Sequence, residues 1–204
     1  MTSLTPTTLA WNGDENVRTN IIRISEKYNC KIAVETGTFR GWTSKDLSKI
    51  FKKVYTIEVN FLNYCKSHAA LYYTRNVTVI NGDSAKQLEL LLPKINSEFI
   101  FFYLDAHWES YWPLLDELKS IAKYCHNSCV ICIDDVKVPN RPDIPFDTYN
   151  GNDLSFEYIR SEIEKIYDSY TYEYLIPNQM AEKYHAKIIF YPSDLQSKNK
   201  KLIE

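Results

Sequence analysis

Acidic side chains follow the short apolar runs of this sequence, at the points where strands would end. The runs close in "VET", "TIE", "INGD", "YLD" and "CIDD", which contain Glu35, Glu58, Asp83, Asp105, Asp134 and Asp135. Carboxylates that lie close together repel one another unless a cation or hydrogen-bond donors separate them. The pattern therefore predicts, at one edge of a sheet, a bound cation or a ligand that carries hydroxyls, an amine and a positive centre.

Each of these acids taken alone has a simpler interpretation. Glu35 could cap a neighbouring helix, and Glu58 could be an ordinary surface acid. Asp83 precedes a predicted helix and is a good N-cap residue. The joint occurrence of the acids at successive strand ends is what favours a binding site.

A glycine turn follows the first of these acids, in "ETGTFRG". Gly37 can adopt a tight or positive-φ turn, and its missing Cβ lets a ligand approach the backbone. In sheets of alternating strands and helices, ligands bind outside the carboxyl ends of the strands, and an acid after the next strand can hydrogen-bond ribose hydroxyls. Glu58 is placed to play that part.

The elements that would position these residues alternate regularly. Apolar spacing predicts helices over 16–28, 42–51, 61–73, 84–92 (ending at Pro93), 111–124 and 154–167. Short β-branched, aromatic or apolar runs predict strands over 32–34, 54–57, 77–80, 99–104, 130–133, 170–175 and 187–191. This order predicts an α/β fold with a doubly wound, Rossmann-like, mostly parallel seven-stranded sheet and helices on both faces.

The domain organisation is expected to be simple. With 204 residues and 45% hydrophobic content, the sequence predicts one domain over 1–204, including an N-terminal helical segment over 1–30. The segment 137–152 carries three prolines and "TYNGN". Because it follows the fifth strand, we expect it to be an active-site loop or lid rather than a simple connection.

Composition and charge narrow the class of protein. A net charge of -2 argues against a nucleic-acid partner. No basic, apolar leader and no apolar run long enough to span a bilayer are found, so we expect a cytoplasmic protein without a membrane partner. The five cysteines lack a C-x-x-C pair, which is typical of reduced thiols and argues against zinc in "CHNSC".

The run from Glu35 to Asp135 resembles the class I S-adenosylmethionine-dependent methyltransferases. "VETGTFRG" is similar to their first motif, Glu58 to their ribose-binding acid, and "GDSA" to the motif beside the adenine. The resemblance implies S-adenosylmethionine as cofactor, bound by Glu35, Thr36, Gly37, Thr38, Gly41, Glu58, Asp83, Ser84 and Asp105. The sequence departs from the commonest first motif, since Thr38 stands where a second close glycine is usual.

"YLDAHWESYWPLLDEL…VICIDDV" further resembles the magnesium-dependent O-methyltransferases of the catechol, sugar and macrolide types. This likeness implies a Mg²⁺ ion, or another divalent cation, on Asp105, Asp134 and Asp135, since hard cations prefer oxygen ligands. Where the catechol type has a lysine base, this sequence has Glu109. We therefore assign the catalytic role to His107, assisted by Asp105, because the unperturbed pKa of histidine lies near neutrality.

The methyl acceptor is the least constrained part of the hypothesis. The chain is too short for a separate substrate domain, so we expect a small-molecule acceptor, with a sugar hydroxyl as first choice by analogy. Trp108, Tyr111 and Trp112 are expected to be pocket walls or core residues. A homodimer is left open.

Three other functions are kept as alternatives. The nearest is a metal-independent N- or O-methyltransferase that uses His107 as base. A nicotinamide-dependent oxidoreductase would need G-x-G-x-x-G, where this chain has "GTFRG". A non-catalytic binding protein on the same fold would be expected to lack the cofactor acids Glu35, Glu58 and Asp83.

Overall fold

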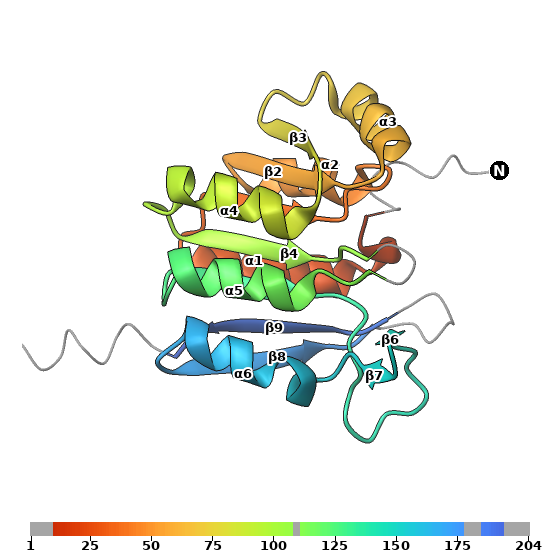
Figure 1. Cartoon of the computed structure of the whole chain (residues 1–204), viewed down its shortest axis with the longest axis vertical. Coiled ribbons are helices and arrows are strands. Elements are labelled where there is room, and N and C mark those ends of the chain that lie inside the picture. Colours follow the sequence, from red (N-terminus) through yellow and green to blue (C-terminus); the bar gives the residue numbers. More distant parts are fainter. Residues whose placement is uncertain (1–9, 108–110, 178–184, 194–204) are drawn as a thin grey trace, which may run out of the picture.

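A seven-stranded sheet forms the centre of the molecule (Figure 1). The computed structural model describes residues 10–107, 111–177 and 185–193. The strand order is β3-β2-β1-β4-β5-β9-β8, with β1 to β5 parallel and β9 and β8 antiparallel. The strands are β1 (Ile32–Thr36), β2 (Lys53–Glu58), β3 (Val77–Asn81), β4 (Ile100–Leu104), β5 (Cys129–Ile133), β8 (Tyr170–Leu175) and β9 (Lys187–Pro192). The predicted doubly wound fold is confirmed.

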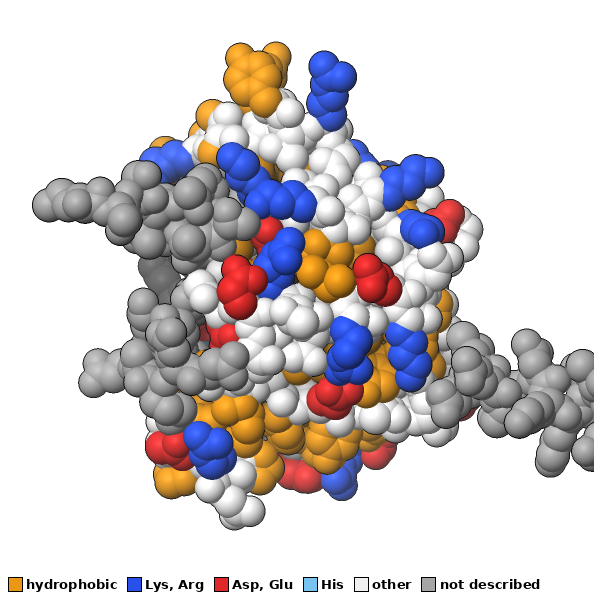
Figure 2. Space-filling view, turned by 180° about the vertical axis from the view of Figure 1, so that it is seen from behind, with side chains coloured by type: hydrophobic (Ala, Val, Ile, Leu, Met, Phe, Trp, Pro, Cys, Tyr) orange, Lys and Arg blue, Asp and Glu red, His pale blue; other side chains and the backbone are white. Residues whose placement is uncertain are grey.

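Helices cover both faces of the sheet and create two cores (Figure 1). The helices are α1 (Glu15–Lys27), α2 (Trp42–Ile50), α3 (Phe61–Leu71), α4 (Ser84–Ile95), α5 (Leu114–Tyr124) and α6 (Phe156–Ile166), and a 3₁₀ turn, η2, spans Ala10–Gly13. One core lies under α4, α5 and α6, and the other under α1 and α2. On the face seen in Figure 2, acidic and basic side chains are interspersed with small hydrophobic areas.

The strands are apolar because they are covered on both faces, as parallel sheets usually are. Every residue of β4 and β5 is buried. The register sets Thr36 beside Ile57 and Leu104, and Leu104 beside Ile133. The carboxyl ends of β2, β1, β4 and β5 therefore stand side by side, with the chain reversing its order between β1 and β4, where ligands bind in such folds.

Four details differ from the sequence-based expectations. The predicted strand over 32–34 continues to Thr36 and the helix expected to stop at Pro93 continues to Ile95, because buried Leu92 and Ile95 anchor its last turn. The helix expected from residue 111 begins only at Leu114, with Pro113 at its N-cap. The segment 137–152 is not all loop, since the hairpin strands β6 (Thr148–Tyr149) and β7 (Asn152–Asp153) lie in and beside it.

Two of the residues singled out in the sequence, and the expected absence of a membrane span, are treated next. Trp108 and Glu109 lie outside the described residues. Within the described residues, no helix is both long and apolar enough to cross a membrane.

Candidate active site

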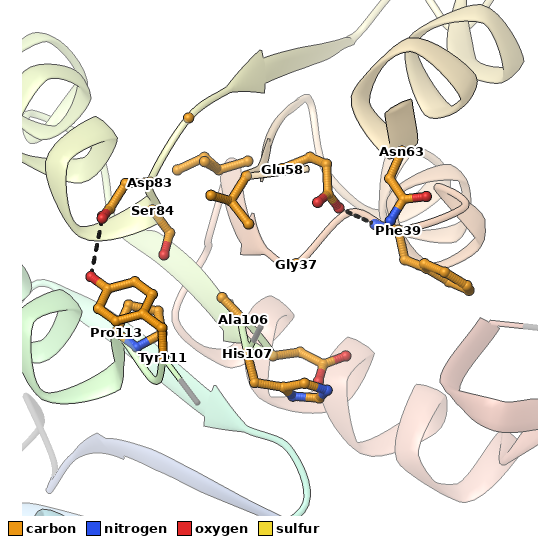
Figure 3. Close-up of a pocket in the computed structure, with 14 residues that line it drawn as sticks. Gly37, Phe39, Glu58, Asn63, Asp83, Ser84, Ala106, His107, Tyr111 and Pro113 are labelled. Carbon is orange, nitrogen blue, oxygen red and sulfur yellow. Dashed lines mark hydrogen bonds between the residues drawn. The ribbon is translucent and has the colours of Figure 1, made fainter. Parts of the chain in front are cut away.

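A cavity of about 400 Å³ opens at the carboxyl ends of β1, β2, β3 and β4 (Figure 3). Its lining brings together five of the predicted site residues with His107 and several apolar side chains. The lining consists of Gly37, Phe39, Ile57, Glu58, Val59, Asn63, Gly82, Asp83, Ser84, Asp105, Ala106, His107, Tyr111 and Pro113. Ligand cavities of this kind are commonly apolar with a few convergent polar groups.

The glycine turn after β1 shapes one wall of the cavity. Gly37 has φ +85°, and a Cβ there would lie far inside van der Waals contact with the carbonyl oxygen of Asp105. Its backbone N–H, like that of Thr38, donates to the carbonyl of Ile57. The turn is thus pinned between β2 and β4, and only a residue without a side chain fits.

The other predicted residues of this turn support it from behind. Glu35, Thr36, Thr38 and Gly41 do not line the cavity. The hydroxyl of Ser44 donates a hydrogen bond to the buried carboxylate of Glu35, as does that of Thr56 at 2.6 Å. Burial raises the pKa of Glu35 to about 7. Glu35 therefore fastens β1 to α2 and β2, and its direct contact with a cofactor stays a prediction.

Glu58 presents a fixed carboxylate at the cavity. One oxygen accepts a hydrogen bond from the backbone N–H of Phe39 at 2.7 Å (Figure 3). The other accepts from the backbone N–H of Asn60 at 2.8 Å. Only 5% of Glu58 is exposed. A carboxylate has about four lone-pair sites, so two remain for donors such as ribose hydroxyls.

The opposite side of the cavity is formed where β3 leads into α4. Asp83 caps α4 by accepting from the N–H of Lys86 at 3.3 Å, and the Tyr111 hydroxyl donates to its other oxygen at 3.1 Å (Figure 3). Burial, together with Asp83, raises the pKa of Tyr111 to about 12. The buried hydroxyl of Ser84 has no hydrogen-bond partner among the described residues. Asp83 thus serves both as helix cap and as cavity wall.

The acids after β4 and β5 lie together, but the protein itself neutralises one of them. One oxygen of Asp134 accepts from Lys187 Nζ at 2.6 Å and from the N–H of Asp135 at 2.8 Å. Its other oxygen accepts from the hydroxyl of Tyr103. Burial opposes ionisation most strongly, but the charge and hydrogen bond of Lys187 together with the hydrogen bonds from Tyr103 and the Asp135 N–H outweigh it and lower the pKa of Asp134. Asp134 is therefore less available to a metal than its position in the sequence suggests.

Asp105 and Asp135 are the acids that remain. Burial raises the pKa of both, and the negative charge of Asp134 adds to the rise. His185 Nδ1 lies 2.6 Å from an oxygen of Asp135, and this hydrogen bond raises the pKa of His185. His107 Nδ1 lies 3.7 Å from an oxygen of Asp147. The site thus has more acidic groups than cationic ones to balance them.

Sequence reasoning missed three residues of this site. Asp147, in the segment predicted as a lid, and His185, just before β9, both reach Asp135. Glu117, in the first turns of α5, is fully buried, and neither of its oxygens has a hydrogen-bond partner in the described part of the chain. Burial raises its pKa to about 7. Only the proline-rich loop around Asp147 carried a local sequence pattern that could point to function.

Comparison with known proteins supports the fold independently of the site. No family model and no curated protein matches the sequence. Among solved structures, the chain is similar to the O-methyltransferase TomG from Streptomyces achromogenes, involved in tomaymycin synthesis, in complex with SAM (15% identity, TM-score 0.62, 86% of this chain and 78% of that chain). It is also similar to an O-methyltransferase from Bacillus cereus in complex with SAH (16% identity, TM-score 0.60, 86% of each chain).

The same comparison shows how far the likeness reaches. A precorrin-8w decarboxylase from Methanobacterium thermoautotrophicum is similar too (18% identity, TM-score 0.56, 86% of this chain and 88% of that chain). The chain has the Rossmann-like fold of class I methyltransferase structures. Since one fold hosts several reactions, the reaction has to be argued from the site.

Proposed function

We propose that the protein is an S-adenosylmethionine-dependent methyltransferase that transfers a methyl group to a hydroxyl of a small molecule, with a sugar or sugar-derived metabolite as the first candidate. The observation that carries this proposal is the Glu58 carboxylate. It is held by two backbone N–H groups at the wall of a cavity that also contains Asp83 and Ser84. The fold supports the proposal, since similar structures bind SAM or SAH.

The donor set of the cavity fits this cofactor. Glu58 can accept hydrogen bonds from the two ribose hydroxyls, and the unpartnered hydroxyl of Ser84 can meet the adenine edge. The backbone of Gly37 lines the cavity without a side chain and leaves room for the methionine part. The cofactor supplies a methyl group on a positively charged sulfur, and the surplus of carboxylates around Asp105 suits a positive centre.

The chain's own residues provide a route for the proton of the acceptor hydroxyl. His107 lines the cavity beside Asp105 and is 46% exposed at its side chain. Its Nδ1 faces Asp147, so Nε2 is left to take the proton. A divalent cation near Asp105 and Asp135 would lower the pKa of the hydroxyl and orient it. The donors present fit such an ion, although Asp134 is better assigned as the partner of Lys187.

The expected class of acceptor follows from the surroundings of His107. The ring of Trp112 stacks between those of Tyr149 and Tyr158, with centroid distances of 4.7 Å to Tyr149 and 5.0 Å to Tyr158. This stacking fixes the hairpin of β6 and β7 next to His107, whose ring contacts that of Tyr149. We expect the acceptor to bind beside His107, between this hairpin and the cofactor cavity. We keep a metal-independent N- or O-methyltransferase as the alternative.

The proposal is tested by incubating the protein with methyl-labelled S-adenosylmethionine and a panel of sugar and phenolic hydroxyl acceptors. We expect transfer to at least one acceptor, and His107→Ala to lower kcat by about 10²- to 10⁴-fold without changing the affinity for S-adenosylhomocysteine. The control is His126→Ala, since His126 pairs with Asp168 on the surface. Equal loss in both variants would refute the role of His107. Transfer that a chelator does not affect would favour the metal-independent alternative.

A further inference from the structure

Five side chains of metal-ligating type gather beside the cofactor cavity: Asp105, His107, Asp135, Asp147 and His185. They form two groups that share Asp135, and within each group the ligating atoms lie within 4.8 Å of one another. The second group, Asp135 with Asp147 and His185, offers two carboxylates and one imidazole. Two of its members come from parts of the chain that the first metal hypothesis did not use.

The backbone holds this second group in place from both sides. The N–H of Asp147 donates to the carbonyl of Asp135 at 3.0 Å, which fixes the hairpin segment against the end of β5. The N–H of Val136 donates to the carbonyl of Ala186 at 3.0 Å, which fixes the residue next to His185. Asp135 itself adopts φ +58°, an uncommon conformation for a residue with a side chain.

A second observation separates this arrangement from an ordinary cluster of surface acids. Next to it lies a small cavity of about 10 Å³, lined among others by Asp135, Asp147 and Glu117. Such a volume is close to the room that one water molecule needs. Glu117 is 0% exposed, and its oxygens have no hydrogen-bond partner among the residues described. A buried carboxylate beside a space of this size suits a cation or a water molecule bound to one.

The charge balance points the same way. Lys187 reaches this region, but its Nζ pairs with Asp134 at 2.6 Å. His185 Nδ1 and an oxygen of Asp135 are 2.6 Å apart and share a hydrogen bond. A metal ion could replace the proton of this bond and bind both groups. A divalent cation would neutralise Asp135 and Asp147 together and reduce the charge near Glu117.

We propose that Asp135, Asp147 and His185 bind a divalent first-row transition metal in preference to Mg²⁺. An imidazole nitrogen suits iron, nickel, copper or zinc, and Mn²⁺ is the first member of the same first-row series, whereas Mg²⁺ prefers oxygen donors in near-ideal octahedral geometry. The inference rests on the proposed function for the purpose of the metal, but the site itself is defined by its donors. It leaves His107 available for proton transfer and ties the hairpin that carries Asp147 to the end of β5.

The experiment uses the full chain, stripped of metal with a chelator and titrated with Mn²⁺ and with Mg²⁺ by calorimetry. Pulsed electron paramagnetic resonance of the Mn²⁺ form detects coupling to a nitrogen ligand. We expect Mn²⁺ to bind at least about 10-fold more tightly than Mg²⁺, and nitrogen coupling to be present. His185→Ala should remove that coupling and weaken Mn²⁺ binding at least about 10-fold.

Matched controls are available for both kinds of ligand. His126→Ala removes a histidine that pairs with Asp168 on the surface, and Asp143→Asn removes an acid that pairs with Arg141 in the same segment as Asp147. Neither should change Mn²⁺ binding, whereas Asp147→Asn should weaken it at least about 10-fold. Circular dichroism of each variant establishes that it is folded. If His185→Ala does not fold, the proposed metal site is tested by two other results. These are the Mn²⁺ affinities of Asp147→Asn and Asp143→Asn and the nitrogen coupling of the unmutated protein.

Equal affinity for the two ions, or Mn²⁺ binding without nitrogen coupling, would overturn the inference. A parallel titration with S-adenosylhomocysteine separates this failure from failure of the proposed function. Cofactor binding without a nitrogen-coupled metal refutes the metal site alone. A nitrogen-coupled metal without cofactor binding refutes the proposed function and leaves the metal site standing.

Discussion

Replacing Glu117 by Gln should stabilise the ligand-free protein, and should do so only at neutral and alkaline pH. Burial raises the pKa of Glu117 from the ordinary value of 4.5 to about 7, so the folded state holds a proton that the unfolded chain has already released. Stability is therefore lost as pH rises from about 4.5 and levels off above about 7. The full loss is equivalent to about 3 kcal/mol. Gln has nearly the same shape but no charge to bury.

Urea unfolding of the unmutated protein and of Glu117→Gln at about pH 5 and about pH 8 measures this effect. We expect the stability difference between the two proteins to change by about 2.5 kcal/mol between these pH values, in favour of Gln at the higher one. Any cost of the unpartnered amide is present at both pH values and cancels. Glu157→Gln, on a side chain that is 71% exposed, is the control and should show almost no such change. A pH-independent difference for Glu117→Gln would refute the reasoning.

Two further substitutions test how the site is built. Gly37→Ala should destabilise the protein by at least about 2 kcal/mol more than Gly151→Ala in denaturant unfolding. Both glycines have positive φ, but only a Cβ at residue 37 would collide with the backbone of Asp105, whereas a Cβ at residue 151 meets open space. Lys187→Met should cost about 3–5 kcal/mol by leaving buried Asp134 unpaired, and adding Asp134→Asn should recover most of that loss in the same assay. No recovery in the double variant would contradict the assigned pairing.

The sheet and its ligand-binding edge could be predicted from the sequence because their causes are local. Strands buried on both faces must be apolar runs, and the turns that end them need glycine or a helix cap. Asp83 shows both effects, since the sequence marks it as an N-cap and the structure confirms that role. The start of α5 was misplaced, since the apolar spacing continues through Trp112 although Pro113 sets the boundary.

The electrostatics of the site could not be predicted, because the decisive partners are far apart along the chain. Lys187 is 53 residues from Asp134, and His185 is 50 residues from Asp135. From the sequence alone, the acids at the strand ends are expected to need a ligand that separates their charges. In the structure, Lys187 at the start of β9 and His185 just before it pair with two of these acids. Glu117, which no local sequence pattern marks, has no hydrogen-bond partner among the described residues.

The most direct test of the central claim is a calorimetric titration of the full chain with S-adenosylhomocysteine, compared with Glu58→Ala. We expect a dissociation constant in the micromolar range for the unmutated protein and no measurable binding for the variant, because Glu58 is the carboxylate that the backbone N–H groups of Phe39 and Asn60 hold at the cavity wall. Absence of binding in the unmutated protein, or equal binding in both proteins, would contradict the assignment of this cavity to the cofactor.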